Sequence, residues 1–115
     1  MSNCSEFWYK MKIHIKENSF LARLAAYILH EDSVAVVIGK TIYLWNTDRQ
    51  DFLKNKKWLS HELVHIQQFK QYGVLRFLFL YMWESLRNGY YNNKFEVEAR
   101  QKENDEAPVI KAIFN

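Results

Sequence analysis

The sequence predicts a mostly helical α+β domain that contains a small antiparallel sheet. The 115 residues include only 3 glycines and 1 proline, which disfavours a turn-rich β-sandwich and favours long helices. Residues 34–45 are the one stretch with the pattern of a β-hairpin. A chain of this length corresponds to one domain, and its 49% hydrophobic residues are enough for one core. We therefore interpret residues 1–115 as a single domain.

Two helices are expected before the hairpin. Apolar residues recur at helical spacing over about residues 5–16 and again over about residues 20–28. The hairpin combines a β-branched run, residues 34–38, with a run of alternating character, residues 41–45. Gly39 begins the two-residue loop between these strands, which is typical of a tight hairpin turn.

Four helices are expected after the hairpin. Asp48 can cap a short helix that ends near residue 53. Apolar periodicity predicts helices over residues 57–72 and 74–88, and each of them stops at a glycine. A last helix is expected over about residues 94–105. The helix at 74–88 is apolar nearly all round, so we expect it to be buried or to face a partner or a membrane surface.

Charge and composition exclude several classes of protein. The 16 Lys and Arg are interleaved with 13 Asp and Glu, whereas a nucleic-acid-binding protein would be expected to cluster its basic residues. The start of the chain lacks the pattern of a secretory signal, and the longest apolar run is too short to span a bilayer. The single cysteine, Cys4, excludes an internal disulfide. We therefore expect a cytoplasmic protein that does not bind nucleic acid.

The most informative motif is His61-Glu62-Leu63-Val64-His65, which matches H-E-x-x-H and lies inside a predicted helix. Residues four apart on a helix are turned by about 40° and separated by about 6 Å, so His61 and His65 can bind one metal ion. Glu62 lies about 100° further round the helix than His61, where its carboxylate can reach a metal-bound water. The pattern predicts a zinc site with a general base beside it.

A catalytic zinc ion needs a third protein ligand and an open fourth position. No histidine follows His65, and the upstream His14 and His30 lie in ordinary amphipathic segments, where we interpret them as structural or surface residues. The remaining candidates are downstream carboxylates: Glu84, Glu96, Glu98, Glu103, Asp105 and Glu106.

The predicted helix at 94–105 is the best source of this third ligand. A helix that turns back after residues 74–88 can return beside the helix that carries the two histidines. Glu96 and Glu98 are about 200° apart on it, so only one of them can face the metal. Geometry alone leaves the choice between these two open.

Several segments together resemble the gluzincin metallopeptidases. They are the motif at 61–65, Tyr72 with Gly73, the apolar helix, and the run Asn93-Lys94-Phe95-Glu96-Val97-Glu98-Ala99. The chain is also similar in length to the minigluzincins, which are single-domain members of that group. This resemblance implies a minimal zincin-like domain, with helices and a small sheet whose edge strand lies above the zinc ion.

The resemblance also implies a third ligand. Gluzincins use a glutamate on a later helix, often in the pattern E-x-x-A-D, and Glu96 followed by Ala99 fits this pattern whereas Glu98 does not. The departure is Arg100, which stands where many gluzincins have an aspartate that supports a ligating histidine.

The implied activity is that of a zinc metallopeptidase with one Zn²⁺ per chain. His61, His65 and Glu96 would hold the ion, and Glu62 would take a proton from the zinc-bound water that attacks a peptide carbonyl. The substrate would be a peptide or an unfolded protein that pairs antiparallel with an exposed edge of the sheet, for which we choose strand 41–45. Candidate donors to the developing oxyanion are Tyr43, Tyr90 and Tyr91.

Three alternatives stay open. The zinc could be structural, with its fourth position blocked by the protein itself, in a regulatory or protein-interaction module. Helix 74–88 could contact a membrane surface, with Arg76 and Arg87 at the interface. The apolar tail at 107–115 could pack on the core, or it could lie in the active-site cleft and make the protein a latent zymogen, as the resemblance to minigluzincins suggests.

Overall fold

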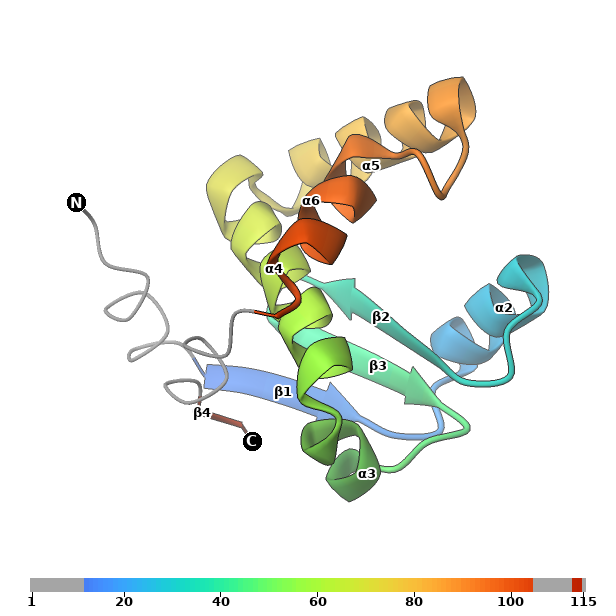
Figure 1. Cartoon of the computed structure of the whole chain (residues 1–115), viewed down its shortest axis with the longest axis vertical. Helices are drawn as coiled ribbons and strands as arrows, with labels where there is room; N and C mark the ends of the chain where they lie inside the picture. The colour runs from blue at the N-terminus through green and yellow to red at the C-terminus, as the bar shows by residue number, and fades with distance from the viewer. Residues whose placement is uncertain (1–11, 105–112, 115) are drawn as a thin grey trace.

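A computed structural model describes residues 12–104, 113 and 114 of the protein. Its elements are, in order, β1 (Lys12–Lys16), α2 (Phe20–Leu29), β2 (Val34–Ile38), β3 (Thr41–Trp45), α3 (Arg49–Lys54), α4 (Lys56–Tyr72), α5 (Val74–Asn88), α6 (Lys94–Lys102) and β4 (Ile113–Phe114). Figure 1 shows several helices around one small sheet, so the predicted α+β fold class is confirmed.

The described strands form a four-stranded sheet in the order β2-β3-β1-β4. β2 and β3 form the predicted antiparallel hairpin, with Val34 opposite Trp45 and Ile38 opposite Thr41. β1 pairs with β3 in parallel, and β4 pairs with β1 in parallel, so the complete sheet is mixed. Strand 41–45 is therefore interior, and its assignment as the exposed edge was wrong. Among the described strands, the free edge beside the helices belongs to β2.

The prediction of a helix over residues 5–16 is also wrong where it can be compared. Residues 12–16 form β1, while residues 5–11 lie outside the described part of the chain. The sequence Lys-Ile-His-Ile-Lys alternates, with Ile13 fully buried and Ile15 packed against the same core. The alternating pattern of this strand is only five residues long. It was not recognised in the sequence because the aromatic residues just before it fall at helical spacing. Because this segment pairs with β3 as β1, β3 is an interior strand.

Local signals fix the remaining boundaries. Asp48 accepts a hydrogen bond from the amide of Asp51 and caps α3, and Asn93 caps α6 in the same way through the amide of Phe95. Helices α4 and α5 end at Gly73 and Gly89, where φ is +87° and +83°, a conformation that favours glycine. The last helix ends at Lys102 and is shorter than the predicted 94–105.

Alternation along β3 separates two packing layers. Ile42 and Leu44 are fully buried on the face covered by α4. They cluster with the apolar stripe of that helix: Leu59, Leu63 and Ile66. Tyr43 and Trp45 point to the other face and pack around Ala22 and Ala26 of α2. The sheet is thus covered by α4 on one face and by α2 on the other (Figure 1).

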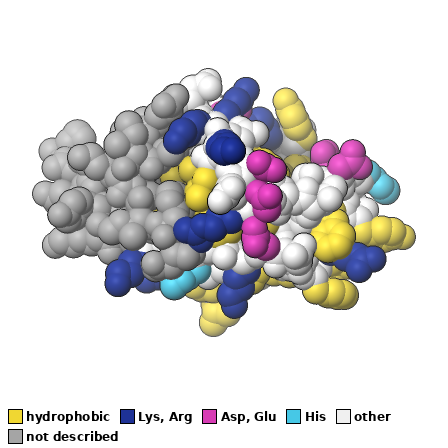
Figure 2. Space-filling view, turned by 90° about the horizontal axis from the view of Figure 1, so that it is seen from below, with side chains coloured by type: hydrophobic (Ala, Val, Ile, Leu, Met, Phe, Trp, Pro, Cys, Tyr) yellow, Lys and Arg dark blue, Asp and Glu magenta, His cyan; other side chains and the backbone are white. Residues whose placement is uncertain are grey.

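Helix α5 is far less buried than its composition predicts. Phe77 is its one buried residue, while Leu75, Phe79 and Leu86 are each at least 70% exposed. In the part of the chain that the structure describes, no helix is long and apolar enough to cross a membrane. Figure 2 shows basic and acidic side chains interspersed on one face, with apolar side chains around its rim. Contact with a membrane surface through 74–88 stays a prediction.

The tail contributes a short strand on the side of the sheet away from β2. Ile113 pairs with Lys12 and Phe114 with Ile13. These two residues therefore lie at the opposite end of the strand order from the free edge of β2. Residues 107–112 and 115 lie outside the described residues, and the inhibitory role of the tail stays a prediction.

Candidate metal centre

Helices α4 and α6 bring three metal-ligating side chains together. Helix α4 buries its apolar stripe against the sheet and presents His61 and His65 on another face, while α6 lies beside it and presents Glu96 (Figure 1). One ligand atom from each of the three residues lies within 4.8 Å of the others. His65 and Glu96 are buried, and His61 is partly buried.

The spacing of these atoms fits a tetrahedral ion. His61 Nε2 is 2.9 Å from Glu96 Oε1, and His65 Nε2 is 3.2 Å from Glu96 Oε2. Ligands held about 2.0–2.1 Å from zinc in a tetrahedron are about 3.3 Å apart, so small side-chain movements would accommodate the ion. Two imidazoles and one carboxylate form the donor set expected for zinc with one open position.

Each histidine is oriented by a hydrogen bond on its other ring nitrogen. His61 Nδ1 lies 2.9 Å from Glu103 Oε2, and Lys57 Nζ lies 3.4 Å from the second oxygen of the same carboxylate. His65 Nδ1 lies 2.8 Å from Gln68 Oε1. If Nδ1 donates in both rings, each Nε2 is left able to bind a metal ion, which is the arrangement that oriented histidine ligands adopt.

Glu96, and not Glu98, reaches the two histidines. The hydroxyl of Tyr81 donates a hydrogen bond to Glu96 Oε2. Glu98 instead accepts from Gln68 Nε2 at 2.6 Å and from Lys102 Nζ at 3.0 Å. The choice that residue spacing left open is thus decided by the packing of α6 on α4, and Glu98 supports the cluster only through Gln68.

The other sequence candidates lie elsewhere. His14 on β1 and His30 at the end of α2 are both exposed, as expected of surface residues. Glu84 accepts hydrogen bonds from the amide of Lys94 and the side chain of Asn88, so it supports the start of α6. Asp105 and Glu106 lie outside the described residues.

Glu103, one of the carboxylates that the sequence offered as a third ligand, is instead a hydrogen-bond partner of His61, a role that the sequence interpretation did not include. Arg100 points away from the cluster, because it donates to the carbonyl of Tyr91 and stacks over that ring at 4.0 Å. Glu103 lies seven residues after Glu96, two helical turns on the same face, and supplies the carboxylate that position 100 lacks. The seven-residue spacing was the available signal.

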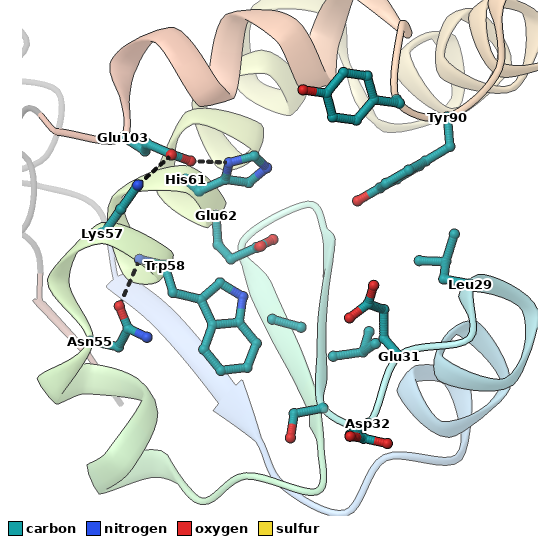
Figure 3. A pocket seen from close by; sticks show the side chains of 14 residues that line it. Leu29, Glu31, Asp32, Asn55, Lys57, Trp58, His61, Glu62, Tyr90 and Glu103 are labelled. Atoms are coloured by element: carbon teal, nitrogen blue, oxygen red, sulfur yellow. Dashed lines mark hydrogen bonds and ion pairs between the residues drawn. The ribbon is translucent and has the colours of Figure 1, made fainter.

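Glu62 lies in the cavity wall beside the cluster. It is only 6% exposed, and Figure 3 shows its carboxylate pointing into the cavity near His61 and Trp58. Burial raises its pKa, and the nearby charges of His65 and His61 offset part of this effect, giving a pKa of about 7. In the metal-free protein, a carboxyl with such a pKa can both accept and donate a proton near neutral pH, as a group that acts first as a general base and then as a general acid must.

The cavity next to Glu62 has a volume of about 770 Å³ and extends along the start of β2. The side chain of Tyr90 reaches into it from the segment between α5 and α6 (Figure 3). Tyr91 is occupied by its stacking with Arg100, and Tyr43 lies on the α2 face of the sheet. Of the three candidate oxyanion donors, Tyr90 and Tyr91 both line this cavity and Tyr43 does not, and Tyr90 is the one whose ring is not stacked on Arg100.

No family model matches the chain, and no curated protein or solved structure is significantly similar to it. The chemistry of the site therefore has to be inferred from its own geometry. That geometry shows a cluster that could hold a metal ion, a buried carboxyl beside it and an open cavity in front of both.

Charge on His61 makes metal binding depend on pH. Burial alone would lower the pKa of His61, but the hydrogen bond to Glu96 and the charge of Glu62 outweigh it and raise the pKa to about 9 in the metal-free protein. Zinc binds neutral imidazole, so it must displace this proton. We expect zinc affinity to increase from pH 6 to pH 9 by up to about tenfold per unit for each proton displaced. Titration calorimetry in buffers of different ionisation enthalpy would measure the released protons, and a pH-independent affinity would contradict this assignment.

Replacing Glu103 by glutamine is expected to weaken zinc binding by about 10–100-fold, the usual cost of losing an outer partner of a ligating histidine. The measurement is competition with a chelator of known affinity. Lys57→Met is the matched control, because Lys57 is 66% exposed and reaches only the far oxygen of Glu103. Equal losses of zinc affinity in the two variants would mean that the ion pair between Lys57 and Glu103, and not the hydrogen bond to His61, supports zinc binding.

Proposed function

We propose that the protein is a zinc-dependent metallopeptidase of the gluzincin type. The observation that carries the proposal is the convergence of His61, His65 and Glu96, with Glu62 buried next to them and facing an open cavity. A purely structural zinc site would have no use for a buried carboxyl that faces an open cavity beside the three ligands.

The residues of the chain can be assigned definite roles. Zinc bound by the three ligands would polarise the peptide carbonyl and lower the pKa of the attacking water. Glu62 accepts the proton of that water as it attacks, and then passes it to the nitrogen of the leaving amine. The hydroxyl of Tyr90 donates a hydrogen bond to the oxygen that becomes negatively charged.

The free edge of β2 supports the binding of an extended substrate. Val34 and Ala35 of this strand line the same cavity as Glu62. A peptide that adds to this edge would form main-chain hydrogen bonds with β2 and run past the metal cluster. This replaces the strand 41–45 chosen from the sequence, and it keeps the expected mode of binding.

Zinc analysis combined with a cleavage assay tests the proposal. We expect about one zinc per chain, hydrolysis of an unfolded protein such as reduced, denatured albumin, loss of hydrolysis with a chelator, and recovery with added zinc. A protein that retains one zinc and cleaves none of a panel of unfolded substrates would instead favour a non-catalytic zinc-binding module.

Tyr90→Phe is expected to lower kcat by about 100-fold or more while KM and zinc content change little, because the hydroxyl acts on charge that develops only in the transition state. Tyr91→Phe is the matched control, since Tyr91 stacks on Arg100 through its ring. Equal activity in both variants would remove Tyr90 from the catalytic group.

A further inference from the structure

The cleft beside β2 has two parts of different chemistry that meet at Glu62. One is the cavity of about 770 Å³ in front of the metal cluster. The other is a groove of about 480 Å³ that follows the whole length of β2 between α2 and α5. Both are lined by Val34, Ala35 and Glu62, so an extended chain paired with β2 would pass through both.

The groove between α2 and α5 is apolar. Its walls are formed by Leu21, Ala25 and Ile28 of α2 and by Leu78 and Met82 of α5. Among the described residues that line it, the only ionisable groups are His65, Glu96, Glu62 and two tyrosines, and no lysine or arginine is present. Apolar side chains of a bound segment would be removed from water there.

The cavity in front of the cluster carries negative charge. The carboxylate of Glu31 extends into it from the turn between α2 and β2, across from His61 and Glu62, and Asp32 lies at its rim (Figure 3). Lys57 is the one lysine or arginine among the described lining residues, and it is paired with Glu103. His61 also lines the cavity but is paired with Glu96 and Glu103, so neither Glu31 nor Asp32 has an ion-pair partner within the described lining.

We propose that this divided cleft binds an extended peptide that has apolar side chains on one side of the reacting bond and a lysine or arginine on the other, with Glu31 as the partner of the cation. The inference rests on the proposed peptidase function for the position of the reacting bond. Charge complementarity favours a basic residue in the polar half. It also disfavours an anionic membrane surface as the occupant, since Glu31 and Asp32 flank the opening.

Binding to the zinc-loaded Glu62→Gln variant tests the proposal without cleavage. The probes are labelled octapeptides of four compositions. One half is leucine-rich or serine-rich, the other half contains lysine or glutamate, and each composition is made in both orders. We expect the leucine–lysine peptides to bind at least about tenfold more tightly than the leucine–glutamate and serine–lysine peptides. Equal affinities for the lysine and glutamate peptides would overturn the proposal.

Variants in each half provide an independent test. Glu31→Lys in the same background should reverse the preference between lysine and glutamate, and Ala25→Glu should remove the preference for leucine over serine. Asp51→Asn, a carboxyl on α3 that lines neither part of the cleft, is the control and should change neither preference. Displacement of the peptides by zwitterionic lipid vesicles would assign the groove to a membrane surface and overturn the proposal. A retained preference in a protein that cleaves nothing would contradict the peptidase function alone.

Discussion

Replacing Glu62 by glutamine is expected to abolish peptide hydrolysis and to leave about one zinc bound per chain. Glutamine has nearly the same shape but cannot accept the proton of the attacking water or return it to the leaving amine. Loss of a positioned general acid–base typically costs about 10²–10⁴-fold, and here one residue performs both transfers. The expected activity is therefore at or below the detection limit of a cleavage assay.

The zinc content separates this effect from damage to the site. Glu62 is not among the three clustered ligands, so metal analysis of the variant should match the unmodified protein. Glu98→Gln is a useful control, because it alters a carboxyl on α6 whose partners among the described residues are Gln68 and Lys102, and it should retain most of the activity. Full activity in Glu62→Gln would show that the proposed water activation is wrong.

The helices and the hairpin could be predicted because their signals are local. Asp48, Gly73, Gly89 and Asn93 each act within a few residues of a helix end, and the loop at Gly39 acts within one turn. The spacing of His61 and His65 likewise depends on one helix alone. These features require no knowledge of which segments meet in space.

The errors concern contacts between segments that are far apart in sequence. Whether residues 12–16 form a helix or a strand depends on their pairing with β3. In that pairing His14 lies opposite Thr41, which is far from it along the chain. The identity of the edge strand then follows from that pairing. In the same way, the seven-residue spacing between Glu96 and Glu103 puts them on one face, but only the packing of α6 beside α4 brings Glu103 to His61.

The choice between Glu96 and Glu98 shows where the sequence reaches its limit. Glu96 and Glu98 point in different directions from the axis of α6, but their spacing alone does not determine which of them faces α4. Phe95 and Ala99 are buried and fix that rotation, which turns Glu96 toward the histidines. The resemblance to gluzincins implied the same residue from the E-x-x-A pattern.

Removing any one of the three clustered residues is expected to lower zinc affinity by more than about 100-fold, since even outer partners are worth about 10–100-fold. His61→Ala, His65→Ala and Glu96→Ala should therefore be purified with little zinc, whereas Glu98→Ala should retain about one per chain. Metal analysis of the four variants measures this directly. Zinc bound to Glu96→Ala and lost from Glu98→Ala would mean that the third ligand has been assigned to the wrong carboxyl.

Thermal unfolding with and without zinc extends this test to the fold. Zinc at about 1,000 times its Kd stabilises the protein that binds it by about 4.1 kcal/mol, so the unmodified protein and Glu98→Ala should gain thermal stability on addition of the metal. Glu96→Ala should gain little. It should also be less stable than the unmodified protein without zinc, because His61, His65 and Tyr81 all lose a buried hydrogen-bond partner. Equal zinc-dependent stabilisation of all variants would place the metal outside this cluster.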